Sequence, residues 1–222
     1  MGIHRGALIV FEGCDRCGKS TQARRIVERL LSTNRKAEFM CFPDRSTDLG
    51  KFIDRYLKNE VELNAREAHL VFAANRQGVV EKMREKLLSG TTLIVDRYLY
   101  SGIAYSMAKG TLNQSMEWAK LHDVGELKPD RILFFDIHPS EVKTRSGFGD
   151  ERLESLDLQT RVYEYMKMLM SEDEELWKTI EAKKNIDDVT EDVWNAVTSV
   201  LSSVSNKPLS YVDINPSVCQ KC

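Results

Sequence analysis

A glycine-rich segment between an apolar run and a helical pattern most constrains this chain. Residues 11–21, FEGCDRCGKST, hold a glycine, four residues, and then glycine, lysine and serine. The preceding run GALIVFEG, residues 6–13, indicates a buried β-strand because it is continuous, rich in β-branched residues and ended by glycine. A helical period begins at Lys19. In this context the spacing predicts a loop whose backbone N–H groups and following helix N-terminus bind phosphate.

Short apolar segments alternate with helical patterns along the rest of the chain. Further strands are expected at residues 37–42, 91–96, 131–137 and 177–182. Helices are expected at residues 19–31, 47–58, 64–89, 99–109, 113–122, 156–170 and 190–204. This alternation predicts an α/β fold of the P-loop NTPase type, with three layers: a parallel five-stranded sheet and helices on both of its faces. We expect one domain over residues 1–209, a short charged lid at about 139–153, and a poorly structured tail at 210–222.

The composition is that of an ordinary globular protein. The 222 residues are 42% hydrophobic and 30% charged with a net charge of -2, so bulk attraction to nucleic acid or to an anionic membrane is not expected. No apolar run approaches the roughly 18 residues that span a bilayer, and the N-terminal run is too short for a signal peptide. We therefore expect a cytoplasmic protein, with a nuclear or mitochondrial pool left open.

The five cysteines include two C-x-x-C pairs, at residues 14 and 17 and at residues 219 and 222. Such pairs can indicate zinc, but the first pair lies inside the phosphate loop, and a metal there would draw the loop away from phosphate. Reduced thiols are the expectation.

The loop itself predicts how ATP, the phosphoryl donor, would bind. Lys19 is expected to neutralise the β- and γ-phosphates of ATP, and the Ser20 hydroxyl to reach Mg²⁺. Asp96 ends the strand expected at 91–96 and is placed as a second Mg²⁺ contact, direct or through water. The residues expected at ATP from the loop are Gly13, Cys17, Gly18, Lys19, Ser20 and Thr21.

Several further segments carry a family resemblance. They are FPDRST (42–47), FAANR (72–76), VDRYLYSGIAY (95–105) and GFGDER (147–152). Together with the phosphate loop, and in this order from Arg5 to about Leu209, the sequence resembles thymidylate kinase of the eukaryotic and poxvirus type. The resemblance implies Mg²⁺- and ATP-dependent phosphorylation of dTMP to dTDP by in-line transfer, for dTTP synthesis, and a homodimer.

The resemblance also assigns roles within the loop. Asp15 matches the residue that binds the 3′-hydroxyl of dTMP, and Arg16 matches the one that points at the transferred phosphoryl group. One loop would then serve both substrates. The alternative is that Asp15 and Arg16 simply pair with each other.

Matching residues outside the loop complete the expected site. The resemblance places Arg145 over ATP as the lid arginine. It also implies that the catalytic residues are Arg16, Lys19, Arg97, Arg145 and Asp96. Phe72 would stack on thymine, Arg76 would bind the edge of the base, and Tyr105 would crowd the sugar 2′ position. Phe72 and Arg76 are four residues apart and would share one helix face. The full set expected at dTMP is Asp15, Arg45, Phe72, Arg76, Arg97, Ser101, Gly102 and Tyr105.

Two departures and two alternative functions stay open at this point. Leu153 stands where the family usually has tyrosine, and Gln77-Gly78 stands where Trp-Glu is common. A glycine within a helix costs up to about 1 kcal/mol relative to alanine and can mark a kink. The alternatives are a deoxynucleoside kinase, which phosphorylates a neutral hydroxyl and has no use for two arginines on a monophosphate, and a nucleotide-binding regulator that has lost catalysis.

Overall fold

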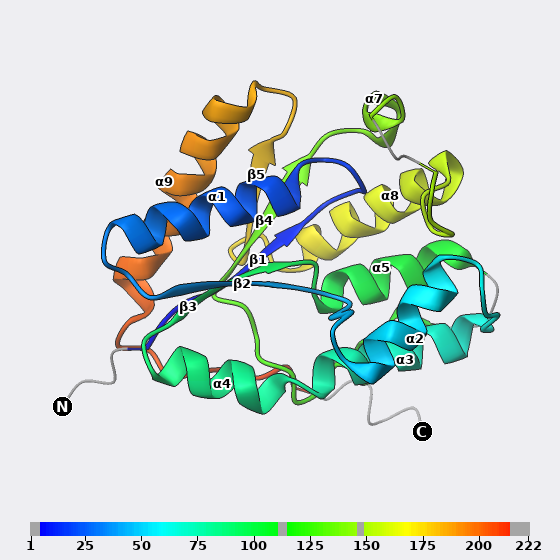
Figure 1. Cartoon of the computed structure of the whole chain (residues 1–222), viewed down its shortest axis with the longest axis horizontal. Coiled ribbons are helices and arrows are strands. Elements are labelled where there is room, and N and C mark those ends of the chain that lie inside the picture. Colours follow the sequence, from blue (N-terminus) through cyan, green and yellow to red (C-terminus); the bar gives the residue numbers. More distant parts are fainter. Residues whose placement is uncertain (1–4, 111–114, 146–148, 214–222) are drawn as a thin grey trace.

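The computed structural model describes residues 5–110, 115–145 and 149–213 (Figure 1). Its centre is one parallel sheet with strand order β2-β3-β1-β4-β5, which confirms the predicted five strands. The strands are β1 (Leu8–Glu12), β2 (Ala37–Cys41), β3 (Thr92–Asp96), β4 (Arg131–Asp136) and β5 (Trp177–Glu181).

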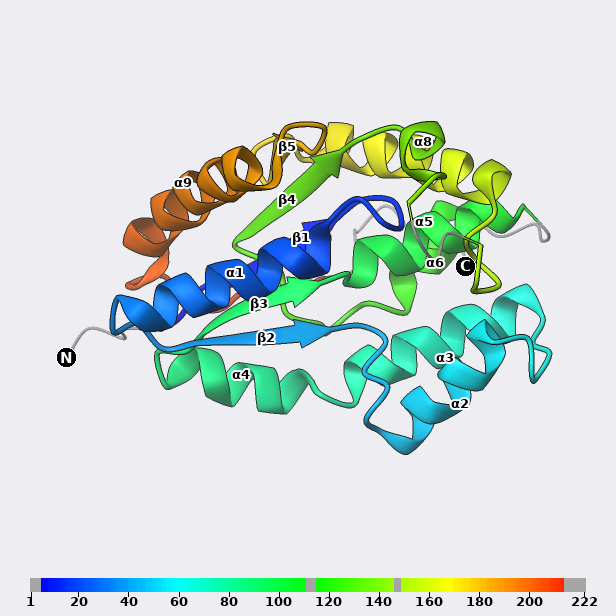
Figure 2. The same cartoon turned by 45° about the horizontal axis from the view of Figure 1, so that its top comes forward.

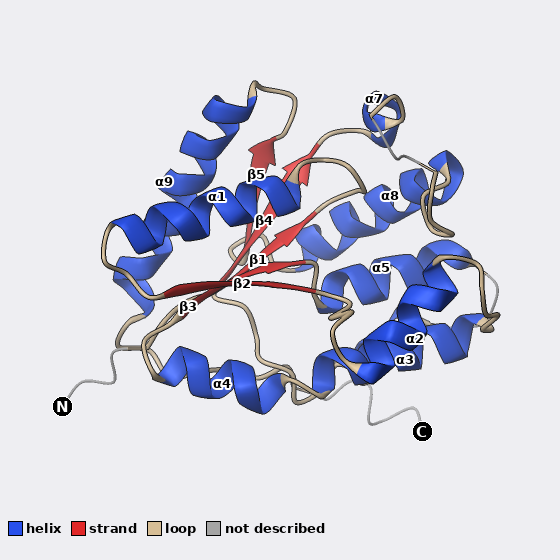
Figure 3. Ribbon diagram, viewed as in Figure 1, coloured by secondary structure: helices blue, strands red, loops and turns tan. Residues whose placement is uncertain are grey.

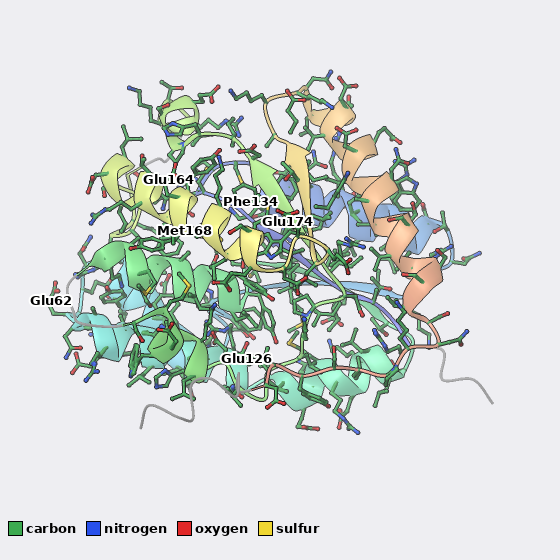
Figure 4. The ribbon with its side chains drawn as sticks, turned by 180° about the vertical axis from the view of Figure 1, so that it is seen from behind. Glu62, Glu126, Phe134, Glu164, Met168 and Glu174 are labelled. Carbon is green, nitrogen blue, oxygen red and sulfur yellow. The ribbon has the colours of Figure 1, made fainter. Side chains whose placement is uncertain are left out.

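Helices cover both faces of the sheet, as expected from the apolar character of its central strands. Along β1, Leu8 and Val10 pack with helices α4 (Val80–Leu88), α5 (Leu99–Lys109) and α8 (Leu156–Glu172). The alternate residues Ile9 and Phe11 face α1 (Lys19–Ser32) and α9 (Ile186–Val204). Each of these buried side chains contributes roughly 1.5–3 kcal/mol. Phe134 of β4, labelled in Figure 4, packs on Tyr163 of α8 with ring centroids 5.9 Å apart.

The predicted helix at 64–89 is two helices in the structure, which corrects the sequence expectation. α3 (Ala65–Gln77) starts at a capping box in which Asn64 and Glu67 exchange side chain-to-backbone hydrogen bonds. It ends at Gly78, and α4 begins after Val79, whose backbone leaves the helical region at φ -120° and ψ 3°. The helix-breaking glycine therefore marks a real interruption.

Other boundaries also differ from expectation. α9 begins at Ile186 rather than at residue 190, because the Asn185 side chain accepts hydrogen bonds from the backbone N–H groups of Asp187 and Asp188. A short helix, α7 (Pro139–Val142), lies within the predicted lid. The remaining helices are α2 (Asp48–Leu57) and α6 (Met116–Leu121). Residues 113 and 114 of the helix predicted at 113–122 lie outside the described residues.

The start of the expected tail is ordered by pairing. Residues 210–213 run beside residues 125–128, with an antiparallel bridge between Leu127 and Tyr211. The backbone N–H of Val212 donates to the carbonyl oxygen of Glu126 at 2.8 Å. These four residues are therefore paired with the segment at 125–128, and residues 214–222 lie outside the described part.

The loops that follow β1, β2 and β3 meet at the carboxyl edge of the sheet, where ligands bind in open α/β folds (Figure 3). α2 and α3 lie beyond the end of β2 and extend this edge (Figure 2). Within residues 5–110, 115–145 and 149–213, no helix combines the length and the apolar character that crossing a membrane demands.

Candidate active site

The loop between β1 and α1 has the geometry of a phosphate cradle. Gly13 has φ 146°, and a Cβ there would lie 2.9 Å from the carbonyl oxygen of Phe135, so only glycine fits. Gly18, at φ 102°, precedes α1, whose N-terminus has no side-chain cap among the described residues. The first backbone N–H groups of α1 are thus left for a ligand. The ammonium of Lys19 is buried and donates to the carbonyl oxygens of Gly13 at 3.2 Å and Cys14 at 2.7 Å.

The two residues predicted at Mg²⁺ are in contact. The Ser20 hydroxyl donates to Oδ2 of Asp96. The other carboxylate oxygen, Oδ1, is buried and has no hydrogen-bond partner within the described residues. A hydroxyl beside a carboxylate with an unsatisfied oxygen is a donor set that suits Mg²⁺.

Asp15 lies at the centre of a hydrogen-bond network. Its carboxylate accepts from the Arg97 guanidinium, from the Tyr105 hydroxyl at 2.9 Å and from the Gln159 amide at 2.5 Å. Burial opposes ionisation of Asp15, but the charges of Arg97 and Lys19 outweigh it and hold the pKa of this carboxyl below its usual value. Arg16 instead pairs with Glu154 at 3.1 Å. The structure therefore shows two separate ion pairs: Asp15 pairs with Arg97, and Arg16 pairs with Glu154.

Arg97 is held in place by a buried carboxylate that the sequence analysis missed. Glu12, at the end of β1, is fully buried, and burial raises its pKa. It accepts from the backbone N–H groups of Tyr98 at 3.0 Å and Ser101 at 3.1 Å, and from the Ser101 hydroxyl at 2.6 Å. Arg97 in turn donates to the Ser101 hydroxyl at 3.0 Å. Glu12 thus fixes the start of α5 and the arginine beside it.

A pocket of about 320 Å³ opens next to the phosphate loop. It lies between the carboxyl ends of β2 and β3, helices α2, α3 and α5, and three residues at the end of the lid, Glu151, Leu153 and Glu154. All eight residues expected at dTMP line it: Asp15, Arg45, Phe72, Arg76, Arg97, Ser101, Gly102 and Tyr105. The structure therefore brings together side chains that are spread over 91 positions of the sequence.

Arg76 has partners that the sequence did not indicate. Its guanidinium is buried and binds two carboxylates, with Nε 3.0 Å from Glu126 and Nη2 in contact with Asp123. Glu126 lies between α6 and β4 and is labelled in Figure 4. A Cβ at Gly102 would lie 2.9 Å from Nη1 of Arg76, so glycine lets α5 approach the guanidinium. Arg76 thus lines the pocket, while Asp123 and Glu126 hold its guanidinium in place.

The lid and α2 are joined to the site by arginines. Arg45 donates to Asp54 at 2.5 Å and to Glu151 at 2.8 Å, which links α2 to the lid. Arg145, the predicted lid arginine, donates to the carbonyl oxygen of Arg16 at 2.5 Å. It therefore lies against the phosphate loop, whereas residues 146–148 of the predicted lid lie outside the described part.

Gln159 of α8 is a second site residue without a sequence signal. Its side chain is fully buried, accepts from the backbone N–H of Asp15 at 2.8 Å, and donates to the Tyr105 hydroxyl at 2.7 Å. It also donates to the carbonyl oxygen of Leu153 at 2.8 Å. The position where the family usually has tyrosine thus contributes a backbone group to the Asp15 network, and its apolar side chain lines the pocket.

His69 of α3 also lines the pocket and was not predicted. Its Nδ1 lies 2.7 Å from the Ser106 hydroxyl, and its ring packs on Trp118 with centroids 4.8 Å apart. Burial, together with the charge of Arg76, lowers the pKa of His69 to about 4. The fold therefore favours the neutral ring.

A pH prediction follows from this shift. Because the pKa is lowered from 6.5, the stabilisation is complete above pH 6.5 and is lost as the pH falls towards 4. We expect His69 to account for about 2 kcal/mol of lost unfolding free energy between pH 7 and pH 5. Urea unfolding of the wild type and of His69→Gln at both pH values measures it, because glutamine keeps a polar contact with Ser106 but does not titrate. An equal loss in both proteins would contradict the prediction.

Comparison with known proteins agrees with this geometry. The family model described as "Thymidylate kinase" matches residues 11–193. The chain is 41% identical to a thymidylate kinase of Homo sapiens over 209 residues, which cover 94% of this chain and 98% of that protein. It is 43% identical to one of Caenorhabditis elegans over 199 residues, covering 86% and 89%.

Similarity extends to a virus and to a solved structure. A protein of Invertebrate iridescent virus 6, described as a putative thymidylate kinase, is 36% identical over 209 residues and covers 94% of each chain. The solved thymidylate kinase of Candida albicans superimposes with a TM-score of 0.80 at 34% identity, covering 95% of this chain and 97% of that one. With the phosphate loop, the Asp15 network and the lined pocket in place, these matches show that the chain belongs to the thymidylate kinase family.

Proposed function

We propose that this protein transfers the γ-phosphoryl group of ATP to the 5′-phosphate of dTMP, forming dTDP and ADP. The observation that carries the proposal is the single pocket beside the phosphate loop, which contains all eight residues expected at dTMP. Arg45 and Arg97 supply two guanidinium groups for the acceptor phosphate, whose oxygens match their planar forks.

On the donor side, Lys19 and the N–H groups at the start of α1 bind the ATP phosphates. Ser20 and Asp96 would hold Mg²⁺ directly or through water. This is supported by their contact and by Oδ1 of Asp96, which has no hydrogen-bond partner in the part of the chain that the structure describes. The ion would supply neutralisation of the charge on the ATP oxygens.

The chain itself contributes positioning and charge. An acceptor phosphate is already an anion, so no general base has to remove a proton. Lys19 and Arg97 border the space between the loop and the pocket, and Arg16 and Arg145 approach it from the loop and the lid. Their positive charges stabilise the migrating phosphoryl group where water is excluded.

Recognition of dTMP uses the far part of the pocket. Asp15 accepts a hydrogen bond from the sugar 3′-hydroxyl, and Tyr105 crowds the 2′ position and favours deoxyribose. Phe72 stacks on the base, and Arg76, anchored by its two carboxylates, binds its edge. This preorganisation lowers the cost of ordering the site when the nucleotide binds.

A deoxynucleoside kinase is the alternative that the pocket disfavours. Such an enzyme needs a carboxylate base near a neutral hydroxyl. Asp15 is a weak base because its pKa is lowered, and the carboxylate of Glu12 is occupied by the start of α5. Two arginines at the acceptor end would also have no phosphate to bind.

Coupled ADP release with dTMP, with and without Mg²⁺, tests this function. We expect turnover with Mg²⁺, its loss in EDTA, and a roughly tenfold or greater fall in kcat for Ser20→Ala at subsaturating Mg²⁺. Ser20→Thr is the matched control, because threonine keeps a hydroxyl at this position of the phosphate loop. Turnover that EDTA leaves intact would contradict the metal assignment, and ATP binding without turnover would favour a regulator.

We propose a homodimer on the family resemblance alone, which analytical ultracentrifugation tests.

A further inference from the structure

Two cysteines lie together inside the phosphate loop. Cys14 and Cys17 are free and buried, with 1% and 3% of their surface exposed. The thiol of Cys14 donates to the carbonyl oxygen of Ile137 at 3.5 Å, and the Lys19 ammonium lies 3.5 Å from the sulfur of Cys17. Phosphate binding as described above uses glycines, backbone N–H groups and Lys19, and needs neither thiol.

The backbone permits these cysteines to form a disulfide. Asp15 and Arg16 form a turn between them, so Cys14 and Cys17 stand at its first and last positions. Such a turn brings its end Cα atoms within about 7 Å, and disulfides join Cα atoms about 4.4–6.8 Å apart. Only a small movement of the loop is therefore required.

The surroundings also separate the two thiols chemically. Burial opposes ionisation of Cys17, but the neighbouring Cys14 thiol and the charge of Lys19 outweigh it and lower the pKa of Cys17 to about 6. The neighbouring Cys17 sulfur and burial raise the pKa of Cys14. A thiolate nucleophile thus lies beside a thiol that can resolve its oxidation product.

We propose that Cys14 and Cys17 are a redox modification site, at which a peroxide forms a disulfide that prevents ATP from binding to the loop. The Cys17 thiolate attacks one peroxide oxygen, an S–O bond forms, the O–O bond breaks, and water leaves after protonation. The sulfur of Cys14 then attacks the sulfenic acid of Cys17, an S–S bond forms, and the S–O bond breaks to release a second water. Two thiols lose two electrons in total, and hydrogen peroxide gains them.

The disulfide acts on the donor site through the loop backbone. The carbonyl oxygen of Cys14 accepts from Lys19, and Cys17 immediately precedes Gly18 at the start of α1. Joining the two sulfurs in a covalent bond of about 2.05 Å shifts the N–H groups that face the phosphates. Hydrogen peroxide is smaller than the phosphate that this loop must admit, and bound ATP would cover its approach.

Peroxide treatment of the full chain tests the proposal by mass and by activity. Trypsin cleaves after Arg16, so the disulfide joins peptide 6–16 to peptide 17–19 and gives one linked species. We expect this species to form with hydrogen peroxide, to disappear with dithiothreitol, and to be suppressed by prior addition of Mg-ATP. ATP-dependent turnover should fall at least roughly tenfold and recover on reduction.

Cys14→Ser and Cys41→Ser are the matched variants. Cys14→Ser should form no linked peptide, and because its Cys17 sulfenic acid lacks a resolving thiol, prolonged peroxide should leave a loss that dithiothreitol does not restore. Cys41→Ser should respond as the wild type does. Absence of the linked peptide, or an equal reversible loss in Cys14→Ser, would overturn the proposal. The turnover assay rests on the proposed kinase function, whereas detection of the linked peptide by mass does not. A protein that forms the linked peptide but has no dTMP kinase activity when reduced would therefore refute only the proposed function.

Discussion

Arg16→Ala is expected to lower kcat about 100- to 1,000-fold while changing KM for dTMP only slightly. Arg16 lies at the tip of the phosphate loop and is held by Glu154 of the lid rather than by Asp15. We propose that its charge acts on the phosphoryl group in transfer, whose transition state spreads negative charge over three equatorial oxygens. An interaction of this kind lowers kcat and kcat/KM together when it is removed.

Backbone conformation requires a control for this substitution. Arg16 has φ 63°, in the left-handed region that glycine adopts without strain. Arg16→Gly removes the side chain without that strain, and Arg16→Lys retains the charge. Steady-state kinetics should show equally low kcat for the alanine and glycine variants and a partial recovery for lysine. Nearly normal turnover in Arg16→Gly would refute the catalytic role of Arg16.

Arg76→Leu is expected to lower the free energy of unfolding by about 3–5 kcal/mol. Arg76 is buried and binds Asp123 and Glu126, both of them buried as well. Removing the arginine leaves two carboxylates in a low-dielectric environment without a counter-charge, and that penalty exceeds the gain from the apolar side chain.

A compensating variant separates charge burial from simple loss of packing. Arg76→Leu combined with Asp123→Asn and Glu126→Gln removes the uncompensated charges and should recover most of the lost stability in urea unfolding. If the triple variant is no more stable than Arg76→Leu, the destabilisation arises from packing, and the explanation by buried charge is wrong.

The parts of the site that were predictable are those encoded by local spacing. The phosphate loop needs a strand, a fixed glycine spacing and a helix start, and all three are adjacent in the sequence. Asp96 could be placed beside this loop because an acidic residue at the end of a strand reaches the same edge of the sheet, and it contacts Ser20 there. These signals depend on neighbouring residues and on the parallel topology, which the strand–helix alternation already indicates.

The parts that were missed depend on contacts between distant segments. Glu12 holds the start of α5, Gln159 joins α8 to Asp15, and Glu126 anchors Arg76 from a loop 50 residues away. Each is an ordinary polar residue in sequence, and only the packed structure shows that it is buried and hydrogen-bonded. Sequence reasoning could state that Arg76 faces the pocket but not what would hold it there.

The ends of helices and of the fold also differ in how far the sequence predicts them. The break at Gly78 was foreseeable because the residue itself disfavours a helix, yet the sequence pattern was continuous enough to predict one helix over 64–89. The order of residues 210–213 was not foreseeable, because it arises from backbone pairing with residues 125–128 rather than from the polar side chains of the tail.

Competition among acceptors tests the central claim most directly. The enzyme is incubated with Mg-ATP and equal concentrations of dTMP, dUMP, dGMP and thymidine, and the nucleotide products are separated and quantified at low conversion. The pocket predicts that dTDP is the main product, with no dTMP formed from thymidine. Formation of dTMP from thymidine as the main product would contradict the account, because the arginines at the acceptor end would then have no phosphate to hold.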